Sequence, residues 1–194
     1  MNKRRSKRAP RKMNPVFLVF CEGDTEEAYV NFLRQRYQLP VKIISRITGL
    51  SISPIILQRH IQAEKIGPGD KVTSFLMYDL DNKNIAEKLD GCKDSINIAS
   101  NPSVELWFLL HTGKQNAAVS TDICIDKLIK STPDWANYKK GSLSEKQKQF
   151  LWENRGLASE RAKQLQEGVN PSSLVYRLIE IMEEAVYFPT TNQY

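Results

Sequence analysis

Acidic residues follow two apolar segments in the first half of the chain. Glu22 comes directly after the apolar run 16–21, and Asp79 and Asp81 come after a second apolar segment, 73–78. In an open parallel sheet, functional sites form just outside the carboxyl ends of the strands. If these segments are neighbouring strands, the three carboxylates converge there, and their mutual repulsion favours a bound cation. Oxygen ligands of this kind suit Mg²⁺ or Mn²⁺, which can activate water for attack on a phosphodiester.

Each acidic segment alone also has a purely structural interpretation. A glutamate and a glycine after a strand are typical of a turn, and Asp79-Leu80-Asp81 could end a strand or cap a helix. The two segments together, at the ends of different strands, favour a metal site. A restriction-like nuclease motif ending in Asp81-Asn82-Lys83 would need an antiparallel hairpin, and the helices predicted between the strands argue against it.

Alternating strand and helix patterns in residues 15–111 would position these acids. The uninterrupted apolar run 16–21 is typical of a strand buried on both faces. Further strands are predicted at 41–48, 73–78 and 95–99, and helices from Asp24 or Thr25, from Pro54, at 85–89 and at 102–111. Strands separated by helices favour parallel pairing. The sequence therefore predicts an α/β fold with a mostly parallel four-stranded sheet flanked by helices.

Only helical patterns follow His111. Helices are predicted at 122–130, 143–154, 159–167 and 172–187. We interpret 112–194 as a helical extension packed on the α/β core, not as an independent domain. Trp107 and Phe108 lie in an apolar helical segment and are expected in the core.

The positive charge is concentrated at the start of the chain. The formal net charge is +6, yet seven lysines and arginines fall within the first twelve residues, which leaves 21 basic against 22 acidic side chains elsewhere. Residues 1–14 are expected to form a disordered basic tail that either holds nucleic-acid phosphates or only aids solubility. The candidate nucleic-acid contacts are Lys3, Arg4, Arg5, Arg8, Arg11, Lys12, His111 and Arg161.

The remaining composition predicts a cytoplasmic protein without membrane contact. No apolar run approaches the roughly 20 residues that span a bilayer, and the run 16–21 is followed by acids instead of a cleavage site. Three widely spaced cysteines without a paired motif are expected to be reduced. No phosphate-binding loop of the Gly-x4-Gly-Lys-Ser/Thr type is present, so a nucleotide switch would belong to another protein.

Several motifs taken together resemble those of a known family. Val19-Phe20-Cys21-Glu22-Gly23 followed by Thr25-Glu26, with Asp79-Leu80-Asp81 after an apolar strand, resembles the Toprim domain shared by topoisomerases, primases and OLD-type nucleases. The segment 101–111, NPSVELWFLLH, taken with Asn170-Pro171-Ser172-Ser173, narrows the resemblance to the RloB family, which includes the AbiLii-type abortive-infection proteins.

This resemblance spans residues 16–184 and implies a Toprim-like fold and a role in bacterial defence against phage, beside a partner ATPase of the ABC/SMC-like class. By position, Glu22 would be the general acid/base or a metal ligand, Asp79 and Asp81 the metal-binding pair, and Glu105 a further catalytic acid. Nothing resembles a primase zinc finger or a strand-passing domain, which favours an effector that cleaves DNA or RNA. The alternative is a non-catalytic Toprim-like subunit that binds nucleic acid or regulates the ATPase.

Overall fold

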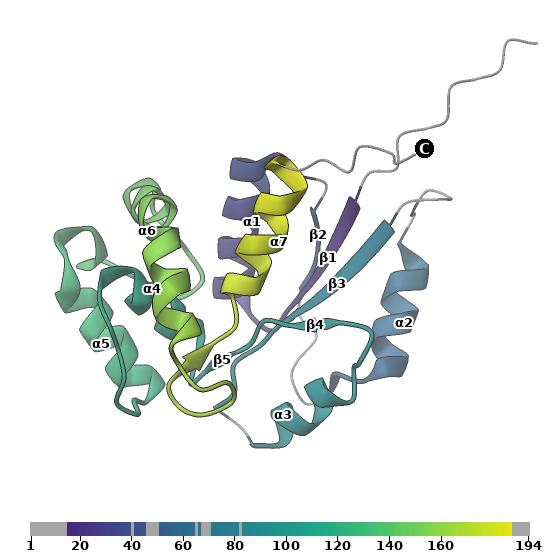
Figure 1. Ribbon diagram of the computed structural model, residues 1–194, viewed down its shortest axis with the longest axis horizontal. Helices are drawn as coiled ribbons and strands as arrows, with labels where there is room; N and C mark the ends of the chain where they lie inside the picture. Colours follow the sequence, from purple (N-terminus) through teal and green to yellow (C-terminus); the bar gives the residue numbers. More distant parts are fainter. Residues whose placement is uncertain are drawn as a thin grey trace, which may run out of the picture.

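A parallel sheet forms the centre of the structure, a computed structural model that describes residues 15–39, 41–45, 51–64, 66, 71–81 and 83–187. Its strands stand in the order β2-β1-β3-β4 and all neighbours pair in parallel (Figure 1). They are β1 (Pro15–Cys21), β2 (Val41–Ser45), β3 (Lys71–Met77) and the two-residue β4 (Ile96–Asn97). The predicted α/β class, with parallel strands flanked by helices, is confirmed.

Both faces of β1 are buried, as its uninterrupted apolar sequence predicts. Phe17, Val19 and Cys21 belong to one core cluster, which also contains residues of α1, α4, α5, α6 and α7. Leu18 and Phe20 belong to a second cluster, shared with α2 and α3 on the opposite face (Figure 1). The helices are α1 (Asp24–Tyr37), α2 (Pro54–Ala63), α3 (Lys83–Asp90), α4 (Val104–Thr112), α5 (Thr121–Ser131), α6 (Glu145–Lys163) and α7 (Tyr176–Tyr187).

The order in which the chain adds strands to the sheet reverses between β1 and β3. From β1 it passes through α1 to β2 on one side, and then through α2 to β3 on the other side of β1. The helices that follow β1 and β3, α1 and α3, cover opposite faces of the sheet, so the connections diverge at the carboxyl ends of β1 and β3 and leave a crevice there. Glu22 and Asp79 follow these two strand ends.

Two Asn-Pro-Ser segments from distant parts of the sequence pair as a small antiparallel sheet. In β5 (Ser100–Asn101) and β6 (Ser172–Ser173), Ser100 stands opposite Ser173, and their hydroxyl groups lie 2.9 Å apart. The peptide bonds before Pro102 and Pro171 are both cis. Because Asn101 and Ser172 pair as strand residues, the helices expected from 102 and from 172 begin later, at Val104 and Tyr176.

Other element boundaries differ from the prediction in ways that local contacts explain. The fourth strand, expected at 95–99, is limited to β4 because the chain then turns to pair β5 with β6. Gly23, one residue before the expected caps, occupies the N-cap position of α1. Residues 46–48 of the expected second strand lie outside the described residues. None of the helices in the described part of the chain is long and apolar enough to cross a membrane.

One long helix, α6, replaces the two helices predicted at 143–154 and 159–167. A capping box fixes its start: the Ser144 hydroxyl accepts from the Gln147 N–H, while the Gln147 side chain accepts from the Ser144 N–H. The helix then runs without a break through Gly156, which is exposed. A glycine inside a helix lowers stability without necessarily ending the helix.

Replacing Gly156 with alanine should stabilise the protein by about 1 kcal/mol, because alanine has the better helix propensity. A Cβ atom at this position would meet nothing within 4 Å. Urea unfolding monitored by circular dichroism measures the change. Gly168→Ala is the control, since its φ of +75° disfavours a side chain and should make that variant less stable. A Gly156→Ala protein that unfolds at lower urea than wild type would contradict the prediction.

Candidate acidic active site

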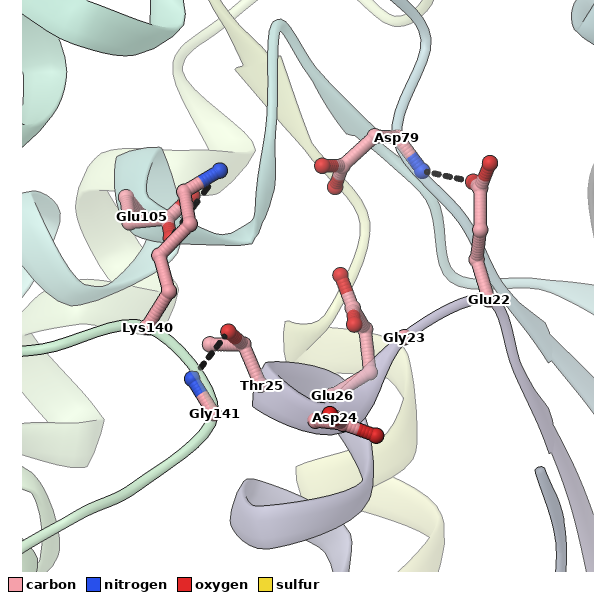
Figure 2. A pocket seen from close by; sticks show the side chains of 9 residues that line it. All are labelled: Glu22, Gly23, Asp24, Thr25, Glu26, Asp79, Glu105, Lys140 and Gly141. Carbon is pink, nitrogen blue, oxygen red and sulfur yellow. Dashed lines mark hydrogen bonds and ion pairs between the residues drawn. The ribbon is translucent and has the colours of Figure 1, made fainter. Parts of the chain in front are cut away.

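A cavity of about 340 Å³ lies at the crevice between the carboxyl ends of β1 and β3 (Figure 2). Five acidic residues and one lysine contribute to its wall. Glu22 follows β1, Asp24 and Glu26 are in the first turn of α1, Asp79 follows β3, and Glu105 is in the first turn of α4. The lining residues are Glu22, Gly23, Asp24, Thr25, Glu26, Asp79, Glu105, Lys140 and Gly141.

Asp79 connects three of the elements that form the cavity. Its Oδ1 accepts a hydrogen bond from the Val104 N–H at 2.9 Å, where α4 begins. Its own N–H donates to Oε2 of Glu22 at 3.2 Å. Ser103, in the N-cap position of α4, makes no capping bond with its side chain, so a carboxylate from the end of β3 performs that role. The contact therefore fixes Glu22, Asp79 and the start of α4 relative to one another.

The carboxylates of Asp79 and Glu26 point toward one another across the cavity (Figure 2). Burial raises the pKa of Asp79, and the negative charges of Glu26 and Glu105 raise it further. Burial likewise raises the pKa of Glu26, with added repulsion from Glu105 and Glu22. The amino-terminal ends of α1 and α4 face the same space, and their partial positive charges oppose this effect in part. The pair consequently resists simultaneous ionisation.

Two hydroxyl groups hold the side chain of Glu105 in place, and this side chain is only 1% exposed. Oε2 accepts from the Ser103 hydroxyl at 2.7 Å, and Oε1 accepts from the Tyr138 hydroxyl at 2.9 Å. The ammonium group of Lys140 lies 3.7 Å from the same Oε1. A buried carboxylate with this many donors keeps one orientation, which suits a site that must be positioned before a ligand arrives.

The structure brings together some of the predicted site residues and separates others. Glu22, Asp79 and Glu105 line the cavity, whereas Asp81 is an exposed residue outside it. The expected convergence of Glu22, Asp79 and Asp81 therefore holds for the first two only. Strand-like pairing ends at Asp79, which forms a parallel bridge with Ser100 through the bonds Ser100 N–H to Tyr78 carbonyl and Leu80 N–H to Ser100 carbonyl, and α3 begins at residue 83.

The predicted nucleic-acid contacts His111 and Arg161 make hydrogen bonds within the protein. His111 is 2% exposed, its Nδ1 lies 2.8 Å from the Trp107 carbonyl, and burial lowers the pKa of its ring to about 3. A neutral, enclosed imidazole is unsuited to binding phosphate. The Arg161 guanidinium donates to the Leu110 carbonyl at 2.6 Å. Lys3, Arg4, Arg5, Arg8, Arg11 and Lys12 lie outside the described residues.

Two cavity residues were not predicted from the sequence as site residues. Glu26 belongs to the motif that resembles the Toprim domain but was not predicted to line the site, although its spacing of four from Glu22 carries a signal, since a helix beginning between them directs both toward the strand end. Lys140 reaches the cavity from a turn 35 residues beyond Glu105; the basic and aromatic residues 138–140 are compatible with an exposed loop or a nucleic-acid surface, and neither interpretation predicts that contact. Among the described residues, no group of three or more histidines, cysteines, aspartates or glutamates is already arranged to hold a metal ion.

The fold and the cavity define a class: an α/β protein with an acidic pocket at the point where its parallel sheet reverses strand order. The RloB-like protein family matches residues 17–182. The chain therefore belongs to the RloB-like family, as the motifs predicted. No curated protein and no solved structure gives a significant match. The more specific assignment to a Toprim-like fold stays a prediction.

Replacing Glu26 with glutamine should stabilise the metal-free protein at pH 8. A carboxyl pKa that is higher in the folded state than in the unfolded chain means that folding stability falls as pH rises from about 4. Glutamine removes the charge and keeps an oxygen acceptor, so we expect a gain of the order of 1 kcal/mol at pH 8, within the usual range for single substitutions. The gain should vanish near pH 4, where wild type is protonated as well.

Urea unfolding in EDTA at a series of pH values measures this effect. Asp24→Asn is the matched control, because it removes the same charge from the same helical turn at an exposed position. It should bring no comparable gain. If Glu26→Gln unfolds more easily than wild type at pH 8, the carboxylate is stabilising and the proposed repulsion is absent.

Proposed function

We propose that this protein is a divalent-cation-dependent nuclease that cleaves phosphodiester bonds of DNA or RNA in bacterial defence against phage. One observation carries the proposal: carboxylates from the ends of β1 and β3 and from the first turns of α1 and α4 line a single cavity. Sites of parallel sheets form at this position, and acidic clusters with raised pKa values are typical of functional sites.

The donor set suits Mg²⁺ or Mn²⁺. Glu22, Glu26, Asp79 and Glu105 offer only carboxylate oxygens, the ligands that hard divalent cations prefer. A cation would also relieve the repulsion that raises the pKa of Asp79 and Glu26. When bound, such an ion polarises a phosphoryl oxygen and lowers the pKa of its water. Flexible glutamate side chains would need to rotate to complete the ligand set.

The protein's own groups account for the remaining requirements of phosphodiester hydrolysis. Glu22 would orient or deprotonate the attacking water, and the Asp79 N–H holds one of its oxygens at 3.2 Å. The amino-terminal ends of α1 and α4 direct partial positive charge into the cavity, which favours a phosphate group there. The cavity volume of about 340 Å³ accommodates a phosphate and several waters, at roughly 30 Å³ for each water.

The cellular role is inferred from the family resemblance. It supports a defence effector that acts beside an ABC/SMC-like ATPase, and the lack of a phosphate-binding loop in this sequence agrees with a separate nucleotide switch. The seven basic residues near the start of the chain would add sequence-independent, salt-sensitive attraction for nucleic acid.

Asp79→Asn should abolish Mn²⁺-dependent cleavage of both plasmid DNA and tRNA, with a loss of at least about a hundredfold, comparable to other single active-site groups. Asparagine is preferable to alanine, because its side-chain oxygen can still accept the Val104 N–H. Gel assays with purified protein and an EDTA control measure cleavage, and circular dichroism verifies the fold.

Asp81→Asn provides the matched control for that experiment. It makes the same chemical change two residues away, at an exposed position outside the cavity. We expect it to retain wild-type cleavage. If Asp79→Asn cleaves as well as Asp81→Asn and the wild type do, Asp79 has no role in the mechanism. If only Asp81→Asn loses activity, the reaction takes place elsewhere.

A non-catalytic, nucleic-acid-binding or regulatory subunit is the second candidate. The hydrogen bonds of Asp79 to Val104, and of Glu105 to Ser103 and Tyr138, favour it, since these contacts give the acids a structural role. Calorimetric titration with Mn²⁺ distinguishes the candidates. The nuclease should bind Mn²⁺ at millimolar concentration or below, and Asp79→Asn should weaken that binding.

A further inference from the structure

A tight turn carries a lysine to the wall of the acidic cavity. In the segment Lys139–Ser142, the Ser142 N–H donates to the Lys139 carbonyl at 3.4 Å, and Gly141 has a φ of +81°. A four-residue turn whose third position has a positive φ requires glycine at that position. Lys140 occupies the second position, and its side chain extends toward Glu105 (Figure 2).

The turn is attached on both sides of the cavity. On the α1 side, the Gly141 N–H donates to Oγ1 of Thr25 at 2.9 Å, and a Cβ atom at Gly141 would lie only 3.3 Å from Cβ of Asp24. On the α4 side, Tyr138 donates to Glu105 and packs edge-to-face against Phe108. The backbone that carries Lys140 is therefore fixed relative to the carboxylates.

The contact between Lys140 and Glu105 is poorly explained as a stabilising ion pair. The nitrogen–oxygen distance of 3.7 Å is too long for a hydrogen bond, and the Lys140 side chain is 54% exposed. Because the ammonium group stays exposed to water and makes no hydrogen bond to the buried Glu105, the pair contributes little to stability. The Glu105 oxygens already have shorter partners in Ser103 and Tyr138. A fixed turn that presents a loosely paired ammonium group is better suited to a ligand that arrives later.

We propose that Lys140 binds the substrate phosphate: its ammonium group leaves Glu105 and pairs with a non-bridging oxygen of the phosphodiester beside the cation. This inference rests on the proposed nuclease function and assigns Lys140 a direct substrate contact. A lysine acts as a mobile point charge for phosphate, and it can change partners without moving the backbone. The exchange is favourable once a divalent ion replaces the ammonium group as the neighbour of Glu105.

The test compares Lys140→Gln with Lys139→Gln, its exposed neighbour in the same turn. A fluorescent oligonucleotide with methylene-phosphonate linkages, which replace a bridging oxygen, resist hydrolysis and keep both non-bridging oxygens, is titrated in DNA and RNA forms in Mn²⁺ and in EDTA at about 200 mM salt, where non-specific attraction is weak. We expect Lys140→Gln to lose about tenfold in affinity in Mn²⁺, as for a charged hydrogen bond, and nothing in EDTA. Lys139→Gln should change less than twofold in both.

Three further measurements identify the role of the lysine. Calorimetry should show that Lys140→Gln binds Mn²⁺ at least as tightly as wild type, because a competing positive charge has been removed. Lys140→Arg, which keeps the charge, should recover most of the oligonucleotide affinity. In the cleavage assay, Lys140→Gln should raise KM more than Lys139→Gln does.

Three outcomes would overturn the inference, and they differ from one another. Equal oligonucleotide affinity in the two glutamine variants, with normal Mn²⁺ binding, makes Lys140 an ordinary surface residue and leaves the nuclease proposal intact. Weaker Mn²⁺ binding by Lys140→Gln shows instead that the lysine only positions Glu105. Absence of Mn²⁺ binding by wild type removes the proposed function, and the role of Lys140 with it.

Discussion

The bond between the Asp79 carboxylate and the Val104 N–H joins the end of β3 to the start of α4, and the arrangement of the cavity depends on it. A helix start needs an acceptor for its free N–H groups and is stabilised by negative charge. Here the acceptor comes from a strand and not from the neighbouring Ser103. The distance from the sheet to α4, and hence to Glu105, is set by the length of one aspartate side chain. The same residue holds Glu22 through its N–H.

The close approach of the buried carboxylates of Asp79 and Glu26 lowers the stability of the protein, and contacts elsewhere in the fold must offset that loss. Asp79 and Glu26 face each other in a half-enclosed space, and burial and mutual repulsion both disfavour their ionised forms. A strained acidic cluster persists only where the surrounding structure is stable without it. The two apolar clusters on opposite faces of β1 supply that stability through the apolar surface that they bury. The repulsion is confined to the cavity, whereas the apolar contacts that offset it extend over both faces of the sheet.

The parts of the fold and the site that the sequence predicts are those determined by local pattern. The apolar run of β1, the glutamate after it and the aspartate after β3 follow from strand periodicity and from the rule for parallel sheets. Asp81 is predicted to join the same site because it lies two residues beyond Asp79, but pairing with the sheet ends at Asp79 and Asp81 is exposed. Glu26 and Lys140 depend on how helices and turns from elsewhere meet the strand ends, which is tertiary information.

The Asn-Pro-Ser segments show how a motif can identify a family without supplying its ligands. Ser100 and Ser173 bond to each other across 73 positions of sequence, and the Asn170 side chain pairs with both backbone groups of Val119. Ser103 then donates to Glu105, so the motif fixes the start of α4 from the side opposite Asp79. The motif therefore positions the start of α4, from which Glu105 joins the acids contributed by the sheet and by α1.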